Sequence, residues 1–218
     1  SCLPKPGQFV NIKVDGFYLR RPFSVCDFFD GSLAIIYKIV GNGTKKLSRM
    51  ARNEQLDVIF GLGNGFNLNV AKNSRNVVLI GGGVGIPPLY FVAKNLKKAD
   101  VNFRTVLGFT SSDQVFFSDK FSKFSEVTIV TADGKVGEKG LVTDILGKIS
   151  YDYYFTCGPL PMLKAIHKMS TVPGQLLFES RMACGFGACA ACSLKTLSGS
   201  KKICTEGPMI YSDEVDFS

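Results

Sequence analysis

The chain has 218 residues, enough for one large domain or for two small domains with an appendage. Hydrophobic residues make up 45% of it and charged residues 20%, a balance that permits a core of ordinary size and argues against a disordered chain. The net charge of +8 comes from basic residues that are scattered apart from short pairs, so we interpret it as a solvated surface that mildly favours an anionic ligand, and we expect no nucleic-acid partner.

Residues 1–72 have the pattern of a small antiparallel β-barrel. Turn pairs such as Asp15-Gly16 and Asp30-Gly31 separate short apolar runs, and several short strands with frequent turn signals are typical of that fold. We expect Asn42-Gly43 to be another turn and a short helix to follow Thr44, whose hydroxyl suits a helix cap. The expected strands lie within 7–14, 16–25, 33–40 and 55–63.

Residues 73–179 alternate between strand-like and helix-like runs, which indicates a parallel sheet with helices on both faces. The expected strands lie at 76–80, 104–109, 127–132, 153–158 and 175–179, and the expected helices at 87–99, 118–124, 141–149 and 159–169. The stretch from Asn76 to Ala93 carries no charge, but four glycines and two prolines interrupt it. A strand, a turn and a helix therefore explain it better than a membrane span.

Several features bound the location and the chemistry of the protein. The N-terminal sequence SCLPKPGQFV lacks the apolar core of a signal peptide, so we expect a cytoplasmic protein in which structural disulfides are disfavoured. The single histidine, His167, lies in a helical run without a partner motif and is interpreted as an ordinary helix residue. No string typical of hydrolases or of phosphoryl transfer occurs.

A glycine turn follows the first strand of the expected parallel sheet. Gly82, Gly83 and Gly85 lie between that strand and a helix, where glycine lets the backbone approach a ligand phosphate and helix N–H groups attract it. The spacing departs from the dinucleotide fingerprint, because Pro88 stands at its last position and no acidic residue ends the second strand. A tight turn without a ligand therefore stays open as an alternative.

A second turn, Cys157-Gly158-Pro159, ends the fourth expected strand. Ligands of open parallel sheets bind at the carboxyl ends of the strands, so both turns are candidates for holding a pyridine nucleotide. Cys157 is then a candidate to face a bound nicotinamide, and the alternative is a buried thiol.

The barrel zone carries two candidate phosphate contacts. Arg21 precedes Pro22 and Ser24 on one expected strand, and the planar fork of arginine binds two phosphate oxygens at once. Gly43 and Thr44, at a helix start, offer a second contact. Taken alone, Arg21 also fits an ordinary surface arginine.

The strongest signal is the spacing of four cysteines near the C-terminus. Cys184, Cys189 and Cys192 form the pattern C-x4-C-x2-C, and Cys204 follows downstream, which is the plant-type spacing for a 2Fe-2S cluster. Thiolates are the soft ligands that iron with sulfide requires. A zinc site is the main alternative, although only one CxxC pair is present.

The fourth cysteine is placed by an expected hairpin. The sequences SLKTL and KKIC flank the turn Ser198-Gly199-Ser200. Folding about that turn places Cys204 opposite Leu194, one pleat from Cys192, so that the four thiols converge.

These zones together predict an electron-transfer protein. A pyridine nucleotide carries two electrons and a cluster carries one, so we expect a flavin between them, because a flavin exchanges both. The barrel with its Arg-Pro-x-Ser strand is where we expect that flavin.

The motifs RPFS, GNGT, GGGVGIPPL, CGPLPML and ESRMACGFGACAACS…CTEGP occur in the order seen in the ferredoxin-reductase superfamily. Over nearly its whole length the chain resembles the branch of that superfamily that forms the electron-transfer subunit of type B dihydroorotate dehydrogenase. The resemblance implies an oxidoreductase component with three parts, which are a FAD-binding β-barrel at 1–72, an NAD-binding α/β domain at 73–179 and a 2Fe-2S segment at 180–218.

The resemblance also implies residues for each cofactor. FAD is expected on Arg21, Pro22, Phe23 and Ser24, along Ile36, Tyr37 and Lys38, and at Gly43 and Thr44. NAD is expected across Gly82, Gly83 and Gly85 and at Cys157, Gly158 and Pro159, and the cluster on Cys184, Cys189, Cys192 and Cys204. The implied partner is a separate FMN-containing dihydroorotate dehydrogenase catalytic subunit of pyrimidine biosynthesis.

Members of the family begin with a strand before the PGQFV segment, whereas Pro6-Gly7-Gln8 lies almost at the start here. We therefore expect the barrel to lack its first strand and to carry an unpaired sheet edge. Two other functions stay open. One is a related NAD(P)H:acceptor reductase subunit that serves ferredoxin or sulfide, and the other is a zinc-stabilised, non-enzymatic binding module.

Overall fold

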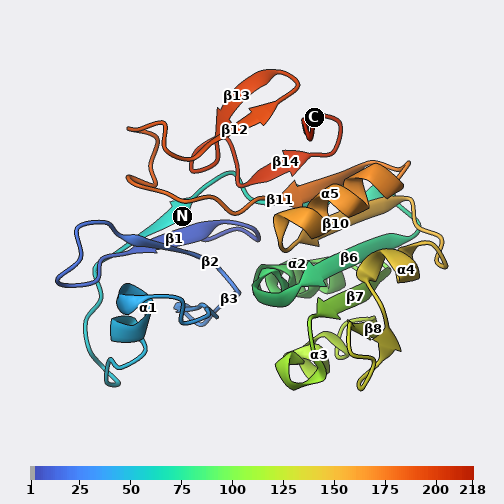
Figure 1. Ribbon diagram of the computed structural model, residues 1–218, viewed down its shortest axis with the longest axis horizontal. Helices are drawn as coiled ribbons and strands as arrows, with labels where there is room; N and C mark the ends of the chain where they lie inside the picture. The colour runs from blue at the N-terminus through green and yellow to red at the C-terminus, as the bar shows by residue number, and fades with distance from the viewer. Residues whose placement is uncertain (1–2) are drawn as a thin grey trace.

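The structure is a computed structural model and describes residues 3–218. Figure 1 shows a small β part on the left, a larger α/β part on the right, and a C-terminal segment that lies above both. The fold is therefore β followed by α/β, as the composition of the zones predicts. No helix in the described range is long and apolar enough to cross a membrane.

The β part consists of a three-stranded antiparallel sheet and a separate hairpin. The sheet has the order β2-β1-β5, so β2 and β5 are its edges and β1 pairs on both sides. The hairpin turns at Asp30 and Gly31, both with positive φ, which is the two-residue turn that matches strand twist. The strands are β1 (Phe9–Ile12), β2 (Arg21–Ser24), β3 (Asp27–Phe29), β4 (Ser32–Ala34) and β5 (Val58–Leu62).

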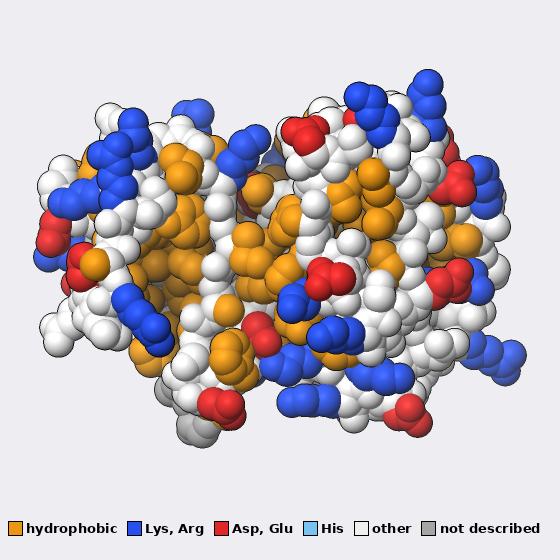
Figure 2. All heavy atoms as spheres, turned by 90° about the horizontal axis from the view of Figure 1, so that it is seen from below, with side chains coloured by type: hydrophobic (Ala, Val, Ile, Leu, Met, Phe, Trp, Pro, Cys, Tyr) orange, Lys and Arg blue, Asp and Glu red, His pale blue; other side chains and the backbone are white. Residues whose placement is uncertain are grey.

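The core of the β part is not fully enclosed. It is built on Val10, Ile12 and Phe23, and the hydrophobic side chains packed against it are only partly buried. The left half of Figure 2, which holds the β part, shows a hollow lined by hydrophobic side chains. Two strands are shorter than predicted. Within the expected strand 16–25 only Arg21–Ser24 is paired, and residues 35–40 of the expected strand 33–40 lie outside any strand.

One local prediction in the β part is wrong. Asn42-Gly43 is not a turn between strands but the first turn of helix α1 (Asn42–Leu47), with Gly41 in the capping position. Thr44 lies inside this helix, and its Oγ1 accepts hydrogen bonds from the N–H groups of Val40 and Gly41, at 3.0 and 3.1 Å. The hydroxyl thus caps the helix from its third position rather than from the residue before it.

The α/β part follows the predicted alternation closely. Its seven-stranded sheet has the order β14-β11-β10-β6-β7-β8-β9, in which every neighbouring pair is parallel except β11 and β14. The first six strands are β6 (Val77–Gly82), β7 (Phe103–Phe109), β8 (Glu126–Thr131), β9 (Glu138–Lys139), β10 (Tyr153–Cys157) and β11 (Gly174–Leu177).

Helices cover both faces of this sheet (Figure 1). Side chains of α2 and α3 pack with Leu79 and Leu107 on one face, and side chains of α4 and α5 pack with Val78 and Ile80 on the other. Two cores separated by a buried sheet explain why its strands read as continuous apolar runs. The helices are α2 (Ile86–Lys98), α3 (Ser118–Phe121), α4 (Val142–Leu146) and α5 (Leu160–Met169), with 3-10 turns η1 (Leu68–Asn73), η2 (Gly83–Gly85) and η3 (Ser112–Gln114).

The C-terminal segment forms a hairpin and then adds a strand to the large sheet. The hairpin pairs β12 (Ser193–Thr196) with β13 (Gly199–Lys202), and β14 (Met209–Tyr211) runs antiparallel to β11. The predicted register is wrong, since Leu194 faces Lys201 rather than Cys204. The turn is the two residues Leu197 and Ser198 followed by Gly199 at positive φ, which is tighter than the predicted turn and places Cys204 beyond the paired residues.

Candidate functional site

The two glycine turns meet at the carboxyl edge of the parallel sheet. β6 and β10 are neighbours, with Cys157 opposite Gly81. A methyl group added at Gly85 would lie 2.5 Å from the carbonyl carbon and oxygen of Cys157 and from the nitrogen of Gly158. One turn therefore rests directly on the backbone of the other. Glycine at position 85 is required by this close approach.

Cys157 lies inside the protein at that edge. Its side chain belongs to the core cluster that contains Leu79 and Phe155, and no part of the residue is exposed. Burial, and then the nearby Glu179, raise the pKa of the Cys157 thiol well above its ordinary value. The thiol is therefore protonated and packed beneath the turn, which matches the buried-thiol alternative, and a role beside a nicotinamide stays a prediction.

A carboxylate lies near the end of β7, the second strand of the parallel sheet, although it belongs to the turn after the neighbouring strand β8. Asp133, in the turn after β8, accepts hydrogen bonds from the backbone N–H and the hydroxyl of Ser112, each of 3.0 Å. The backbone bond from Ser112 is the main cause that lowers the pKa of Asp133 to about 2. Inspection of the second strand alone could not find this carboxylate, because it arrives from another turn.

A cavity of about 550 Å³ lies where the β part meets the other two parts. That volume is typical of a small-molecule or cofactor site. Eight of the residues predicted to hold FAD line it, namely Arg21, Pro22, Phe23, Ser24, Ile36, Tyr37, Lys38 and Thr44. The structure thus brings together around one space residues that lie up to 23 positions apart in the sequence.

Gly43, the remaining residue predicted to hold FAD, acts beneath this lining rather than in it. A methyl group added at Gly43 would lie 2.7 Å from Nε of Arg21, so the guanidinium lies against the bare backbone of helix α1. The guanidinium also stacks over the ring of Phe17, with Cζ 5.0 Å from its centre, and donates to the carbonyl oxygen of Leu19. These contacts hold Arg21 at the wall of the cavity.

The lining combines apolar surface with basic side chains. Phe9, Tyr37 and Phe178 contribute aromatic surface, and the ring of Tyr37 packs 5.0 Å from that of Phe23. Of the basic side chains in the lining, Arg20 forms an ion pair of 2.8 Å with Asp57. Within residues 3–218, the other three, Arg21, Lys38 and Arg181, have no ion-pair partner. A flat apolar ligand with an anionic tail fits this surface.

Other lining residues come from outside the β part. Val84 belongs to the glycine turn η2, and Phe178, Glu179, Ser180, Arg181, Met182 and Pro208 belong to the chain after β11. All three zones of the sequence therefore share one cavity. The sequence signal for the second group was the stretch ESRM, which ends two residues before the first cluster cysteine, but nothing in it indicates that these residues face the barrel.

The four predicted cluster cysteines come together as two pairs of thiols. Sγ of Cys184 lies 3.3 Å from Sγ of Cys189, and Cys192 lies close enough to Cys204 to raise the pKa of the Cys204 thiol. Cys184 also lies close enough to Cys204 to influence its pKa. Cys192 and Cys204 are buried, whereas Cys184 and Cys189 are partly exposed.

Backbone N–H groups surround the outer pair. The backbone N–H groups of Phe186, Cys189 and Gly187 lie around Sγ of Cys184 and lower the pKa of its thiol to about 6, with Phe186 as the largest cause. The bond from Cys189 measures 3.4 Å. Burial and the neighbouring Cys192 thiol instead raise the pKa of Cys204 to about 11. The backbone of the loop therefore stabilises the thiolate of Cys184, the partly exposed member of the outer pair with the lowered pKa.

This arrangement fits an iron–sulfur cluster with two irons. A 2Fe-2S cluster takes four cysteine ligands, two for each iron, and the thiols form two pairs. A structural zinc instead gathers four ligands around one ion. The residues thus fit the 2Fe-2S cluster better than they fit zinc.

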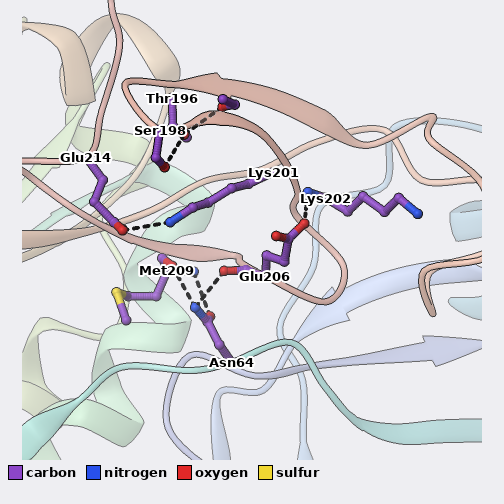
Figure 3. A network of polar contacts seen from close by, with 9 residues as sticks. Asn64, Thr196, Ser198, Lys201, Lys202, Glu206, Met209 and Glu214 are labelled. Carbon is purple, nitrogen blue, oxygen red and sulfur yellow. Dashed lines mark hydrogen bonds and ion pairs between the residues drawn. The ribbon is translucent and has the colours of Figure 1, made fainter.

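The segment that carries Cys204 is anchored to the β part by side-chain contacts (Figure 3). Asn64 donates to the carbonyl oxygens of Glu206 and Met209, at 2.9 and 2.8 Å, and accepts from the N–H of Met209. The carboxylate of Glu206 in turn accepts from the N–H of Lys202 at 2.8 Å. The chain that follows Cys204 is therefore held to the β part by bonds that span more than 140 residues, and the local bond between Lys202 and Glu206 closes the chain around Cys204.

A second cavity, of about 520 Å³, lies at the opposite edge of the sheet. Its lining includes Tyr153, His167, Gly174 and Asp213, at the amino ends of β10 and β11. None of the predicted site residues line it. Since ligands of parallel sheets bind at the carboxyl ends of the strands, the first cavity is the functional candidate.

Comparison with known proteins agrees with this geometry. Residues 179–216 match the family described as the iron-sulfur cluster binding domain of dihydroorotate dehydrogenase B. The chain is 41% identical over 224 residues to the dihydroorotate dehydrogenase B (NAD(+)) electron transfer subunit of Fusobacterium nucleatum subsp. nucleatum, with 97% of this chain and 86% of that protein covered. The chain belongs to this family of electron transfer subunits. A further member, from Geobacillus sp. (strain WCH70), is 43% identical over 223 residues, with 96% and 86% covered.

Solved structures agree with the fold of an electron transfer subunit of this family. One, described as "Insights into flavin-based electron bifurcation via the NADH-dependent reduced ferredoxin-NADP oxidoreductase structure", has a TM-score of 0.89 at 34% identity and covers 98% of this chain and 80% of that chain. Another, "Ferredoxin reductase in carbazole 1,9a-dioxygenase", has a TM-score of 0.59 at 20% identity, covers 76% and 55% of the two chains, and shares the fold alone. The predicted ferredoxin-reductase fold is thus confirmed.

Proposed function

We propose that this chain passes electrons between NAD and an FMN-containing dihydroorotate dehydrogenase catalytic subunit in pyrimidine biosynthesis, with FAD and a 2Fe-2S cluster as its carriers. The proposal rests on one observation above all, which is the single cavity lined by all three zones of the chain. Within it Val84 comes from the glycine turn, and Met182 lies two residues before Cys184. A ligand there touches both the nucleotide edge and the chain that leads into the cluster loop.

Different residues of the cavity would contact the phosphates and the ring of FAD. Arg21 and Lys38 offer cationic contacts for phosphate, and the backbone at Gly43 and Thr44 offers a helix start beside them. Phe23 and Tyr37 supply the apolar surface for a flat ring. When bound, FAD supplies the exchange between the electron pair of NAD and the single electrons of the cluster.

The sheet edge would hold NAD beside that cavity. Gly82, Gly83 and Gly85 form one turn and Gly158 and Pro159 belong to the other. An added methyl group at Gly83 would meet nothing within 4 Å, so the backbone there is open to a dinucleotide phosphate. We also place the protein in the cytoplasm, as the sequence leads us to expect. The domain bounds 1–72, 73–179 and 180–218 remain our division of these roles.

The proposal is tested by removing one cluster ligand. Cys192→Ser should abolish electron transfer to the FMN-containing partner while NADH-to-dye activity through FAD continues. Cys26→Ala is the matched control, since Cys26 is also a buried free thiol but lies next to Asp27, away from the cluster loop. Loss of both activities in the Cys192 variant alone would contradict the proposed order of carriers.

A second candidate function has specific support. The structure with a TM-score of 0.89 is described as an NADH-dependent reduced ferredoxin-NADP oxidoreductase, so a subunit of such a reductase is the alternative. Its identity of 34% is lower than the 41% and 43% of the dihydroorotate dehydrogenase subunits. Purification of the native complex separates the two, because the first function requires an FMN protein that oxidises dihydroorotate and the second requires a ferredoxin-dependent partner.

A further inference from the structure

Asn11 is a buried polar residue at the centre of the small sheet. It lies on β1, only 1% of its surface is exposed, and its partners across the sheet are Pro22 on β2 and Ile59 on β5. Residues opposite each other in an antiparallel pair point to the same face. Asn11 and Pro22 therefore share the face that Phe9 and Ser24 form two residues away.

That face carries residues that line the cavity and also the Asn11 side chain that bonds to Cys184. Phe9, Pro22 and Ser24 line the cavity. Phe9 also belongs to the core cluster that contains Cys192 and Cys204. Asn11 lies two residues along β1 from Phe9. β1 is the central strand of the small sheet, paired with β2 on one side and β5 on the other, and its Phe9 packs in the same core as the C-terminal segment.

The side chain of Asn11 holds the start of the cluster loop. Its Nδ2 donates a hydrogen bond of 3.1 Å to the carbonyl oxygen of Cys184, across 173 positions of sequence. A methyl group added at Gly185 would lie 2.4 Å from the same nitrogen, and Gly185 has φ of +77°. The contact thus needs glycine on the loop side, both for space and for conformation.

This amide is not explained by the stability of the sheet. Asparagine is depleted in strand interiors, and Oδ1 of Asn11 is buried without a hydrogen-bond partner within residues 3–218. An unpaired buried acceptor destabilises a fold, so the placement of this amide calls for an explanation. The one bond that the side chain makes, to Cys184, indicates what that explanation is.

We propose that Asn11 is a positioning residue that fixes Cys184, and with it the outer thiol pair, against the flavin-cavity face of the sheet. The proposal deepens the function proposed above and rests on it. The potential of an iron–sulfur cluster depends on hydrogen bonds to its sulfurs and on its exposure to solvent. Asn11 acts on both, because it holds the backbone from which Phe186, Gly187 and Cys189 direct N–H groups at Sγ of Cys184.

The test compares the full chain, loaded with FAD and reconstituted anaerobically with iron and sulfide, with Asn11→Ala. At unchanged iron, sulfide and FAD content, we expect the rate of cluster reduction by NADH, divided by the rate of flavin reduction, to fall about 10-fold, the size typical of residues behind a metal ligand. We also expect a shifted EPR spectrum of the reduced cluster and a shifted midpoint potential. A wild-type ratio, spectrum and potential would overturn the proposal.

Asn67→Ala is the matched control. Asn67 also joins the N-terminal part to the C-terminal segment, through a bond of 3.0 Å from its Nδ2 to the hydroxyl of Tyr211. It lies away from the cluster loop, so its loss should lower stability without changing the rate ratio, the EPR spectrum or the potential. Equal changes in both variants would make Asn11 a merely structural residue and overturn the proposal.

Asn11→Asp covers the case in which the alanine variant loses its cluster. The carboxylate keeps the size of the side chain but replaces the donor to Cys184 with a negative charge, so the midpoint potential should fall. A folded Asn11→Asp protein that binds FAD and keeps the wild-type potential contradicts the proposal. Asn11 variants that neither fold nor bind FAD also contradict it, because Asn11 would then be needed for the fold as a whole. Folded variants that bind FAD but hold no cluster support it. If the wild-type chain itself takes up no iron and sulfide, the proposed function fails instead.

Discussion

Nζ of Lys94 donates hydrogen bonds of 2.8 Å to both carboxylate oxygens of Asp27, and this ion pair joins helix α2 of the large sheet to strand β3 of the small β part. The two side chains are only 22% and 11% exposed. Nζ of Lys94 also lies 5.7 Å from the centre of the Phe29 ring. The pair holds together the two parts between which the cavity lies.

Lys94→Met should therefore destabilise the protein, because it leaves the Asp27 carboxylate partly buried without its partner. We expect the free energy of unfolding, measured in urea, to fall by about 2 kcal/mol, as for a hydrogen bond to a charged group. Arg104→Met is the control, since its pair with Glu126 is exposed at 57% and 70% and such pairs contribute about 0–1 kcal/mol. Equal losses in the two variants would show that Lys94 has no special role.

Gly43→Ala should weaken FAD binding through Arg21. The added methyl group would lie 2.7 Å from Nε of Arg21 and displace the guanidinium from the cavity wall. Alanine favours a helix by about 1 kcal/mol over glycine, so helix α1 itself should not suffer. We expect the dissociation constant for FAD, measured by fluorescence, to rise about 10-fold, which equals the loss of one net hydrogen bond of about 1.4 kcal/mol.

Gly41→Ala controls for the presence of a methyl group near this helix. Gly41 lies two residues before Gly43, and an alanine side chain there meets nothing within 4 Å. Its FAD affinity should equal that of the wild type. A Gly43→Ala protein that binds FAD as tightly as this control would separate Arg21 from the flavin.

Gly85→Ala should disrupt the nucleotide edge of the sheet. The methyl group would meet only backbone atoms of Cys157 and Gly158, at 2.5 Å, and backbone cannot move aside as a flexible side chain can. Overpacking of this kind costs about 1–3 kcal/mol. We expect both a lower melting temperature and a higher KM for NADH in dye reduction.

Gly147→Ala is the corresponding control. At the end of helix α4 the added methyl group lies 3.5 Å from Cε of Met169, an ordinary contact. This variant should keep the wild-type KM for NADH and lose little stability. A wild-type KM in the Gly85 variant would contradict the placement of NAD at this edge.

Cys184 should be the most reactive thiol once the cluster is removed. Its pKa is lowered to about 6, whereas burial raises that of Cys26 to about 12 and burial with the Cys192 thiol raises that of Cys204 to about 11. The thiolate is the reacting form, so a lowered pKa moves the onset of alkylation to lower pH. In apoprotein treated with iodoacetamide between pH 5 and 9, labelling of Cys184 should rise with a midpoint near its pKa.

Peptide mass spectrometry measures this labelling, with Cys26 as the internal control that stays unmodified across the range. An ordinary thiol has a pKa of about 8.5. If Cys184 labels only near that pH, the backbone N–H groups of the loop do not stabilise its thiolate without iron.

Most of the α/β part could be predicted from the sequence, because its signals are local. The apolar runs that became β6, β7 and β10, and the helical spacing that became α2, depend on residues within a few positions of one another. The C-x4-C-x2-C spacing likewise lies within nine residues, and two of its cysteines, Cys184 and Cys189, have their thiols 3.3 Å apart. Local patterning was therefore sufficient to predict the fold class, and the spacing alone was sufficient to select the four candidate metal ligands.

Tertiary structure alone decided how these pieces meet. Asn42-Gly43 has the composition of a turn, yet helix α1 forms there because Gly43 packs beneath Arg21 and Thr44 caps the backbone. The hairpin register that places Cys204, and the contact of Asn11 with Cys184, involve partners that the sequence does not pair. Hydrogen bonds between residues 140 or more positions apart depend on how whole sheets pack, and no local pattern of residue types records that packing.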